Sequence, residues 1–199
     1  MNRRNFISSA GALLASRSLS ALAPLPVKQG TAKADYSLRI EHCTLEIAPG
    51  VSVKTLAYNG QVPGPLLRLR DGVPVTIDVT NAGPAADLVH WHGLAIDSIN
   101  DGAMEEGSPM IPAGGTLRYS FTPRPSGTRW YHTHASAFDD LAAGTYGGQF
   151  GFLLIEGKEQ PARYDQEINL AIHQWEPYFV PMVETMREQS SNAPMTTGS

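Results

Sequence analysis

Cysteine is almost missing from this sequence, and aromatic residues are few. Cys43 is the single cysteine among 199 residues, which excludes an internal disulfide framework and a cysteine-rich zinc site. A metal site in this chain would therefore have to rely on histidine. Aromatic residues make up only 8%, whereas 19 Gly and 15 Pro interrupt the chain often. That composition favours many short strands and turns, and it predicts an all-β fold.

Acidic residues are absent from residues 1–34, which carry five basic ones. The rest of the chain has ten Lys and Arg against 19 Asp and Glu, a formal net charge of −9. A surface of that sign repels phosphate groups. The charge therefore argues strongly against nucleic acid or anionic lipid as a partner.

Residues 1–34 are predicted to be an export signal rather than part of the fold. The twin arginines Arg3-Arg4, followed by an apolar stretch of small residues over 7–15, are typical of a twin-arginine signal. The stretch is too short to anchor the chain in a bilayer. Cleavage after Ala23 or Ala34 would leave the mature protein in the periplasm. An ordinary secretory signal and an unstructured tail are the alternatives.

From residue 35 onward the pattern is that of a β-sandwich. Apolar and polar residues alternate in short segments, and turn residues such as Asn59-Gly60 and Asp71-Gly72 separate them. A long loop is predicted over 97–115, and one helical turn over 138–143. The predicted strands cover residues 36–41, 44–47, 51–58, 66–70, 73–80, 87–94, 116–121, 128–134, 149–155 and 167–175.

Two histidine pairs, His90-Trp91-His92 and His132-Thr133-His134, are the candidate metal ligands. Histidines at i and i+2 of a strand lie on one face, about 7 Å apart. Four imidazoles converge if the two strands are neighbours, and the spacing suits a metal cluster as well as a single ion. Imidazole binds copper, zinc, iron and nickel, so the residues alone leave the metal open.

Other interpretations of the histidines are weaker. A cupin also carries a His-x-His strand, but the Gly before it and the Glu after it are not matched here, and a cupin would not explain the second pair. His42 and His173 are single histidines and are interpreted as structural. Cys43 is interpreted as a small apolar filler.

A set of further motifs surrounds the histidine pairs and follows a recognisable order. Together they resemble the first, plastocyanin-like cupredoxin domain of a multicopper oxidase, of the laccase-like and copper-tolerance branch. The motifs are Asn59-Gly60-x-x-Pro63-Gly64-Pro65, His90-Trp91-His92-Gly93, Asp101-Gly102, Pro112-Ala113-Gly114-Gly115, Gly127-Thr128-x-Trp130-Tyr131-His132-Thr133-His134 and Gly144-Thr145-Tyr146-Gly147-Gly148.

The resemblance implies a Greek-key β-sandwich over residues 35–157, whose histidines supply half of a trinuclear copper cluster. His90 would bind the type 2 copper, His92 and His132 would share one type 3 copper, and His134 would bind the other. Trp91 and Thr133 would point away and pack in the core.

Asp101 matches the family's acid near the cluster, which is proposed to pass protons to reduced O2. A carboxylate within reach can deliver those protons in a water-poor pocket. A simple turn aspartate before glycine is the alternative. Glu105 and Glu106 depart from the family's usual loop, and their contact with copper or substrate is left open.

The type 1 copper site, with its His-Cys-His segment, has no counterpart in this chain. Residues 158–199 are predicted to be a linker and the start of a following domain, apparently truncated; a disordered natural terminus would look similar. The complete protein is expected to oxidise a phenolic, aromatic amine or metal-ion donor and reduce O2 to water, whereas this chain alone would be inactive. The alternative is a stand-alone periplasmic copper-binding or copper-storage protein.

Overall fold

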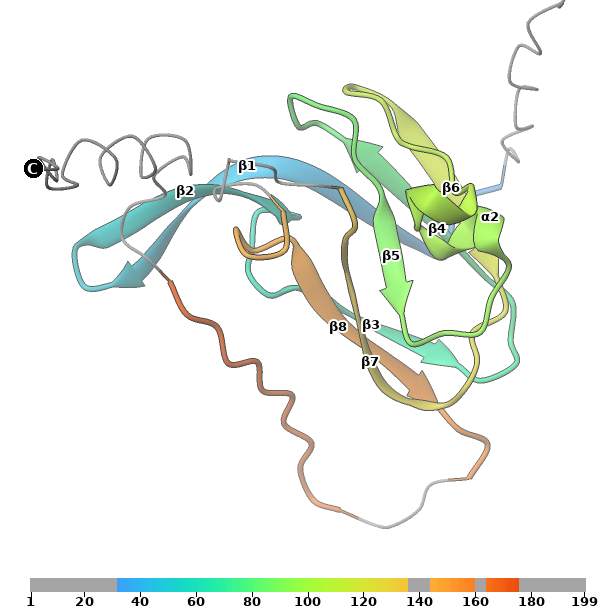
Figure 1. Ribbon diagram of the computed structural model, residues 1–199. Helices are drawn as coiled ribbons and strands as arrows, with labels where there is room; N and C mark the ends of the chain where they lie inside the picture. Colours follow the sequence, from blue (N-terminus) through green and yellow to red (C-terminus); the bar gives the residue numbers. More distant parts are fainter. Residues whose placement is uncertain (1–31, 136–143, 160–163, 176–199) are drawn as a thin grey trace, which may run out of the picture. The chain divides into compact units, whose positions relative to one another are not determined.

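The computed structural model describes residues 32–135, 144–159 and 164–175. Within these ranges, eight strands form two four-stranded sheets (Figure 1). The first has the order β2-β1-β4-β6, and the second has the order β3-β8-β7-β5. The strands of the first sheet are β1 (Tyr36–Ala48), β2 (Val51–Tyr58), β4 (Val75–Asn81) and β6 (Thr116–Phe121). Those of the second are β3 (Gly64–Arg70), β5 (Val89–His92), β7 (Gly127–Thr133) and β8 (Phe150–Glu156).

Strands that are distant in sequence lie side by side in both sheets. β1 pairs in parallel with β4, and β3 pairs in parallel with β8, while the remaining pairs are antiparallel. Such connections between non-consecutive strands define a Greek-key arrangement. The predicted all-β Greek-key sandwich is confirmed.

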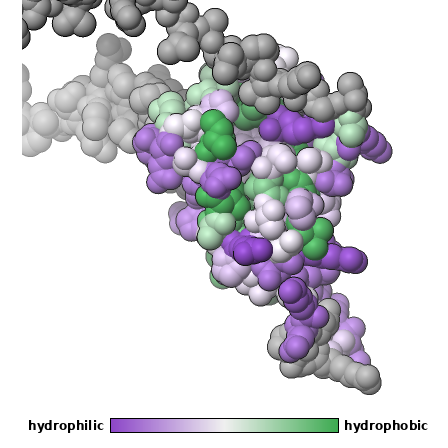
Figure 2. Space-filling view, turned by 90° about the vertical axis from the view of Figure 1, so that its right-hand side faces the viewer, coloured by the Kyte–Doolittle hydropathy of each residue, from purple (hydrophilic) through white to green (hydrophobic). Residues whose placement is uncertain are grey.

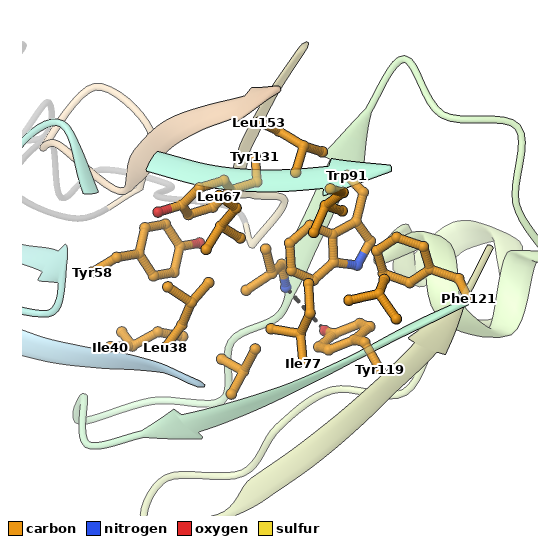
Figure 3. Close-up of a cluster of buried hydrophobic side chains, with 14 of the residues drawn as sticks. Leu38, Ile40, Tyr58, Leu67, Ile77, Trp91, Tyr119, Phe121, Tyr131 and Leu153 are labelled. Atoms are coloured by element: carbon orange, nitrogen blue, oxygen red, sulfur yellow. Dashed lines mark hydrogen bonds between the residues drawn. The ribbon is translucent and has the colours of Figure 1, made fainter. Parts of the chain in front are cut away.

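The core lies between the two sheets and is formed by their inward-facing alternate residues. On β4, for example, Val75, Ile77 and Val79 are buried while the residues between them are not. Trp91 of the second sheet contacts Tyr119 and Phe121 of the first, with ring centroids 5.3 and 5.2 Å apart (Figure 3). Burying such large apolar side chains supplies much of the free energy of folding.

The loop between β5 and β6 contains more structure than the sequence predicted. It forms the short helix α2 (Ser98–Asp101) and the 3-10 turn η1 (Met104–Glu106). Gly102 ends α2 with φ 78°, and a Cβ there would lie 1.8 Å from the carbonyl oxygen of Val89. Only glycine allows the loop to pass this close to β5. The helical turn predicted at 138–143 lies outside the described residues.

The strand predicted over residues 167–175 is wrong. The structure has irregular chain there, because no neighbouring strand within the described ranges supplies hydrogen bonds to its backbone. Contacts with the sandwich hold it instead: Arg68 forms an ion pair with Glu167, and the His173 ring stacks on Phe150 at 5.4 Å. Ile168, Leu170 and Ile172 point outward and are 65%, 82% and 103% exposed.

Polar and apolar residues are interspersed on the face shown in Figure 2, which is the right-hand side of Figure 1, where α2 lies. None of the helices in the described part of the chain has the length and apolar composition needed to cross a bilayer.

Candidate metal centre

The two histidine pairs lie on neighbouring strands, as the sequence predicted. β5 and β7 pair antiparallel, with His90 opposite His132 and His92 opposite Trp130. The ring centroid of His90 lies 5.4 Å from His92, 5.3 Å from His132 and 5.3 Å from His134. The four imidazoles therefore gather on the outer face of the second sheet, around His90.

Hydrogen bonds to the backbone orient two of the rings. His90 Nδ1 lies 2.8 Å from the carbonyl oxygen of Asp101, and His132 Nδ1 lies 2.7 Å from that of Thr133. A carbonyl can only accept, so Nδ1 carries the proton in both rings. The Nε2 lone pair of each ring is then free to bind a metal ion.

The distance between two of the ligand atoms fits a shared metal ion. His92 Nδ1 and His132 Nε2 are 3.3 Å apart. Two nitrogens that each lie about 2.0–2.1 Å from one ion, at a tetrahedral angle, are separated by about 3.3 Å. The potential ligand atoms of His90, His92 and His132 all lie within 4.8 Å of one another. The donor set and its spacing therefore fit a nitrogen-ligated transition metal.

Burial favours the neutral form of two of the candidate ligand imidazoles, His92 and His132. It lowers the pKa of His132 to about 4, with smaller contributions from repulsion by the neighbouring imidazoles. The pKa of His92 is lowered by burial and by His90. Only the neutral imidazole has a lone pair for a metal, so these two rings can bind one near neutral pH.

His134, the second histidine of the second pair, makes fewer contacts within the described part of the chain than the other three. His134 follows the last residue of the strand and lies outside the compact three-histidine group. Its Nδ1 is 3.5 Å from Oε1 of Glu105, on the η1 turn. Glu106, the next residue, is exposed.

The structure brings Asp101 to the site. Its carboxylate Oδ2 lies 3.4 Å from Nδ1 of His90, and its side chain is only 16% exposed. Helix α2 and Gly102 place it there, as the last residue before the loop turns away. Cys43, by contrast, is half-buried on β1 of the other sheet.

A buried polar network behind the histidines was missed by sequence reasoning. The Asp87 carboxylate accepts hydrogen bonds from the amide of Leu88 at 2.7 Å, from Thr133 Oγ1 at 2.6 Å and from Gln149 Nε2 at 2.6 Å. Burial raises the pKa of Asp87. The network ties the start of β5 to the end of β7. An acid just before the buried Leu88 and Val89 was the available signal.

Trp130 packs against the face of the His132 ring. Its indole stacks on the imidazole with centroids 4.1 Å apart and an interplanar angle of 24°. Together with the Thr133 carbonyl, this contact leaves the ring little freedom to rotate.

The Greek-key sandwich defines a cupredoxin-type domain, its histidine face is a candidate metal centre, and the comparisons with known proteins agree with this fold. The sequence profile described as multicopper oxidase matches residues 39–160. The chain belongs to the multicopper oxidase family, and membership implies copper as the metal.

Individual relatives support this assignment. Copper resistance protein A of Pseudomonas syringae pv. tomato is 35% identical over 170 residues, which are 83% of this chain and 26% of the relative. Laccase-1 of Botryotinia fuckeliana is 35% identical over 172 residues, covering 82% and 28%. The chain thus spans about a quarter of the length of these relatives.

Solved structures agree with the sequence relatives. Lac15 from a marine microbial metagenome matches with a TM-score of 0.57 and 34% identity, over 63% of this chain and 33% of that one. Blue copper oxidase from Nitrosomonas europaea matches with a TM-score of 0.57 and 32% identity, over 63% and 39%. The cupredoxin-type fold is thereby confirmed.

Proposed function

We propose that the domain supplies half of the trinuclear copper site of an oxidase. The convergence of four imidazoles on the outer face of β5 and β7 carries this proposal, above all the 3.3 Å between His92 Nδ1 and His132 Nε2. Copper, when bound, would accept single electrons from a phenolic, aromatic amine or metal-ion donor and deliver them to O2, which becomes water.

We assign the four histidines to three copper ions. His90, at the centre of the group, binds the type 2 copper. His92 and His132 share one type 3 copper, and the spacing of their nitrogens supports this pairing. His134, on the other side of the group, binds the second type 3 copper.

Asp101 is proposed to hold and pass protons. Its carboxylate faces the Nδ1 edge of His90 at 3.4 Å and is largely shielded from solvent. A carboxylate close to the site can take part in supplying the protons that O2 needs to become water. The short contact with the histidine supports this role over that of a simple turn residue.

The remaining half of the site is assigned to the longer polypeptide. In this proposal residues 35–157 form the first cupredoxin domain, and 158–199 are a linker and the start of the next. Further cupredoxin domains provide the remaining histidines and the type 1 copper with its His-Cys-His segment. The matched residues make up only about a quarter of these curated relatives, which supports this division.

Residues 1–34 are proposed to direct export to the periplasm by the twin-arginine route. Arg3-Arg4 and the following short apolar stretch support this.

Copper loading of the 199-residue chain tests the ligand assignment. We expect the wild-type chain to bind copper(II), measured by metal analysis after desalting and by electron paramagnetic resonance. The double substitution His92→Ala and His132→Ala should abolish this binding, because it removes both nitrogens of the shared position. His42→Ala with His173→Ala is the matched control. Equal copper content in the two double variants would refute the assignment.

Oxidase activity distinguishes the proposal from a copper-storage protein. The copper-loaded chain should not oxidise a phenolic donor, whereas the protein extended by the domain with the His-Cys-His segment should. An open reading frame that stops after Ser199 in the native gene would instead favour storage.

A further inference from the structure

The ring of His134 is held differently from the other candidate ligands. The rings of His90 and His132 donate Nδ1–H to backbone carbonyls, and His92 packs beside Trp130 with centroids 5.1 Å apart. His134 lies beyond the end of β7 with its side chain 36% exposed. Within the described ranges, no hydrogen bond reaches its ring, and its polar neighbour is Glu105, with Oε1 3.5 Å from Nδ1.

The backbone that carries Glu105 is fixed by the loop around it. The hydroxyl of Ser108, only 5% exposed, accepts hydrogen bonds from the amides of residues 102 and 103 at 2.8 and 3.0 Å. The η1 turn is closed by a 3.0 Å hydrogen bond from Gly107 N to the Met104 carbonyl. These hydrogen bonds therefore fix the backbone position of Glu105 near the end of β7.

The same loop places a second carboxylate near a ligand histidine. Asp101 Oδ2 lies 3.4 Å from Nδ1 of His90, which donates to the Asp101 backbone carbonyl, whereas Glu105 Oε1 lies 3.5 Å from Nδ1 of His134, which has no such carbonyl among the described residues. The loop between β5 and β6 thus places one carboxylate near a histidine of each pair. Metal-binding histidines commonly donate their second ring N–H to a carboxylate or carbonyl, which fixes the tautomer and orientation.

We propose that Glu105 is a positioning residue for His134. Its carboxylate accepts the Nδ1–H of His134 and holds the tautomer in which the Nε2 lone pair is free for copper. The identity of the ion rests on the proposed function, but the tautomer does not. Glu105 itself is 62% exposed and has no other ion pair among the described residues, so its removal should leave the fold intact.

The tautomer can be measured without any metal. We would record long-range ¹H–¹⁵N spectra of the histidine rings in the metal-free 199-residue chain near pH 8.5, about two units above the ordinary imidazole pKa. The wild type and Glu105→Gln should both show His134 protonated at Nδ1, because the amide oxygen also accepts. Glu105→Ala should shift the proton toward Nε2. An unchanged His134 tautomer in Glu105→Ala overturns the proposal.

Copper affinity provides the second measurement. Competition of the same chain with a chelator for copper(II) should show that Glu105→Ala weakens binding about 10- to 100-fold, with Glu105→Gln in between. Glu106→Ala is the matched control, since it removes the same charge from the same turn and should bind as wild type. Thermal unfolding of all metal-free variants should coincide. Equal losses in Glu105→Ala and Glu106→Ala would show a general charge effect and overturn the positioning role.

The two measurements separate the failure of this inference from the failure of the proposed function. If the wild type binds copper and Glu105→Ala binds it equally well, the role of Glu105 is refuted and the copper site stands. If the wild type binds no copper but the tautomer shift occurs, the copper site is refuted and the hydrogen bond to His134 stands.

Discussion

The two faces of β5 and β7 differ in composition, burial and chemistry. The inner face carries buried side chains that join the core between the sheets, whereas the outer face carries partly open imidazoles and the indole of Trp130. The inner residues include Val89, Trp91, Tyr131 and Thr133; the outer ones include His90, His92, Trp130 and His132, with His134 just beyond the end of β7. Because neighbouring residues on a strand point to opposite sides, one short segment serves both stability and metal binding.

Stability and metal binding thus depend on different residues, although these residues alternate along the same two strands. A substitution on the inner face should change the free energy of unfolding and disturb the metal centre only through the backbone. A substitution on the outer face should change metal binding and leave the core packed. The three predictions below test where this separation holds and where it fails.

The largest loss of stability is expected from Trp91→Ala. Trp91 is 0% exposed and contacts aromatic rings of both sheets. Its removal should lower the free energy of unfolding by about 3–5 kcal/mol, measured by denaturant unfolding. Trp91→Phe should cost much less, because the indole Nε1 has no hydrogen-bond partner among the described residues to lose. His92→Ala on the outer face should change stability little. A loss at His92 as large as at Trp91 would contradict the separation of the two faces.

Gly102→Ala is expected to lower both the stability of the fold and the affinity for copper. Its φ of 78° strains any other residue, and its Cβ would overlap the Val89 carbonyl at 1.8 Å. Strain and displaced backbone together should cost about 2–4 kcal/mol. Copper affinity should fall as well, because the displaced loop carries Asp101.

Gly114→Ala is the matched control for Gly102. Its φ is 76°, but a Cβ there would meet no atom of the described residues within 4 Å. It should cost only about 1–2 kcal/mol and leave copper binding unchanged. Equal losses at the two glycines would show that contact with β5 is unimportant.

The last prediction is a pH dependence of the stability of the metal-free protein. The pKa of His132 is about 4 in the folded state against 6.5 ordinarily, because burial disfavours the charged ring. Below pH 6.5 the unfolded chain takes up this proton first, so the free energy of unfolding should fall as pH drops toward 4. The loss should be complete near pH 4, and His132→Gln should make the slope shallower.

His42→Gln, a change on the exposed side of the other sheet, is the control for this slope. The free energy of unfolding of the wild type, His132→Gln and His42→Gln should be measured at several pH values with a chelator present. A slope that is identical in wild type and His132→Gln would show that the buried imidazole does not contribute.

Much of the fold followed from local pattern. Residues 51–58 and 116–121 were predicted as strands with the bounds that the structure has, because turn residues flank them and apolar residues alternate within them. The strand at 167–175 was wrong although its pattern is equally regular. A strand needs a partner for its backbone hydrogen bonds, and alternation alone cannot supply one.

The candidate site divides in the same way. The His-x-His spacing is enough to place two imidazoles on one face of a strand, and the four candidate ligands could be selected from it. The Asp87 network could not be predicted, because two of its partners, Thr133 and Gln149, come from segments 46 and 62 positions away in the chain. The contact between Glu105 and His134 joins residues 29 positions apart and depends on how the loop after β5 folds back.

The sequence by itself determined which side chains are on the same face, since that depends only on the alternation of a strand, and the order of its motifs determined the family. Only the tertiary structure decided that β5 and β7 are neighbours, that His92 and His132 approach to 3.3 Å, and which carboxylates stand behind the rings. These are distances between segments far apart in the chain. They are decided by sheet pairing and by the packing of the core beneath the histidines.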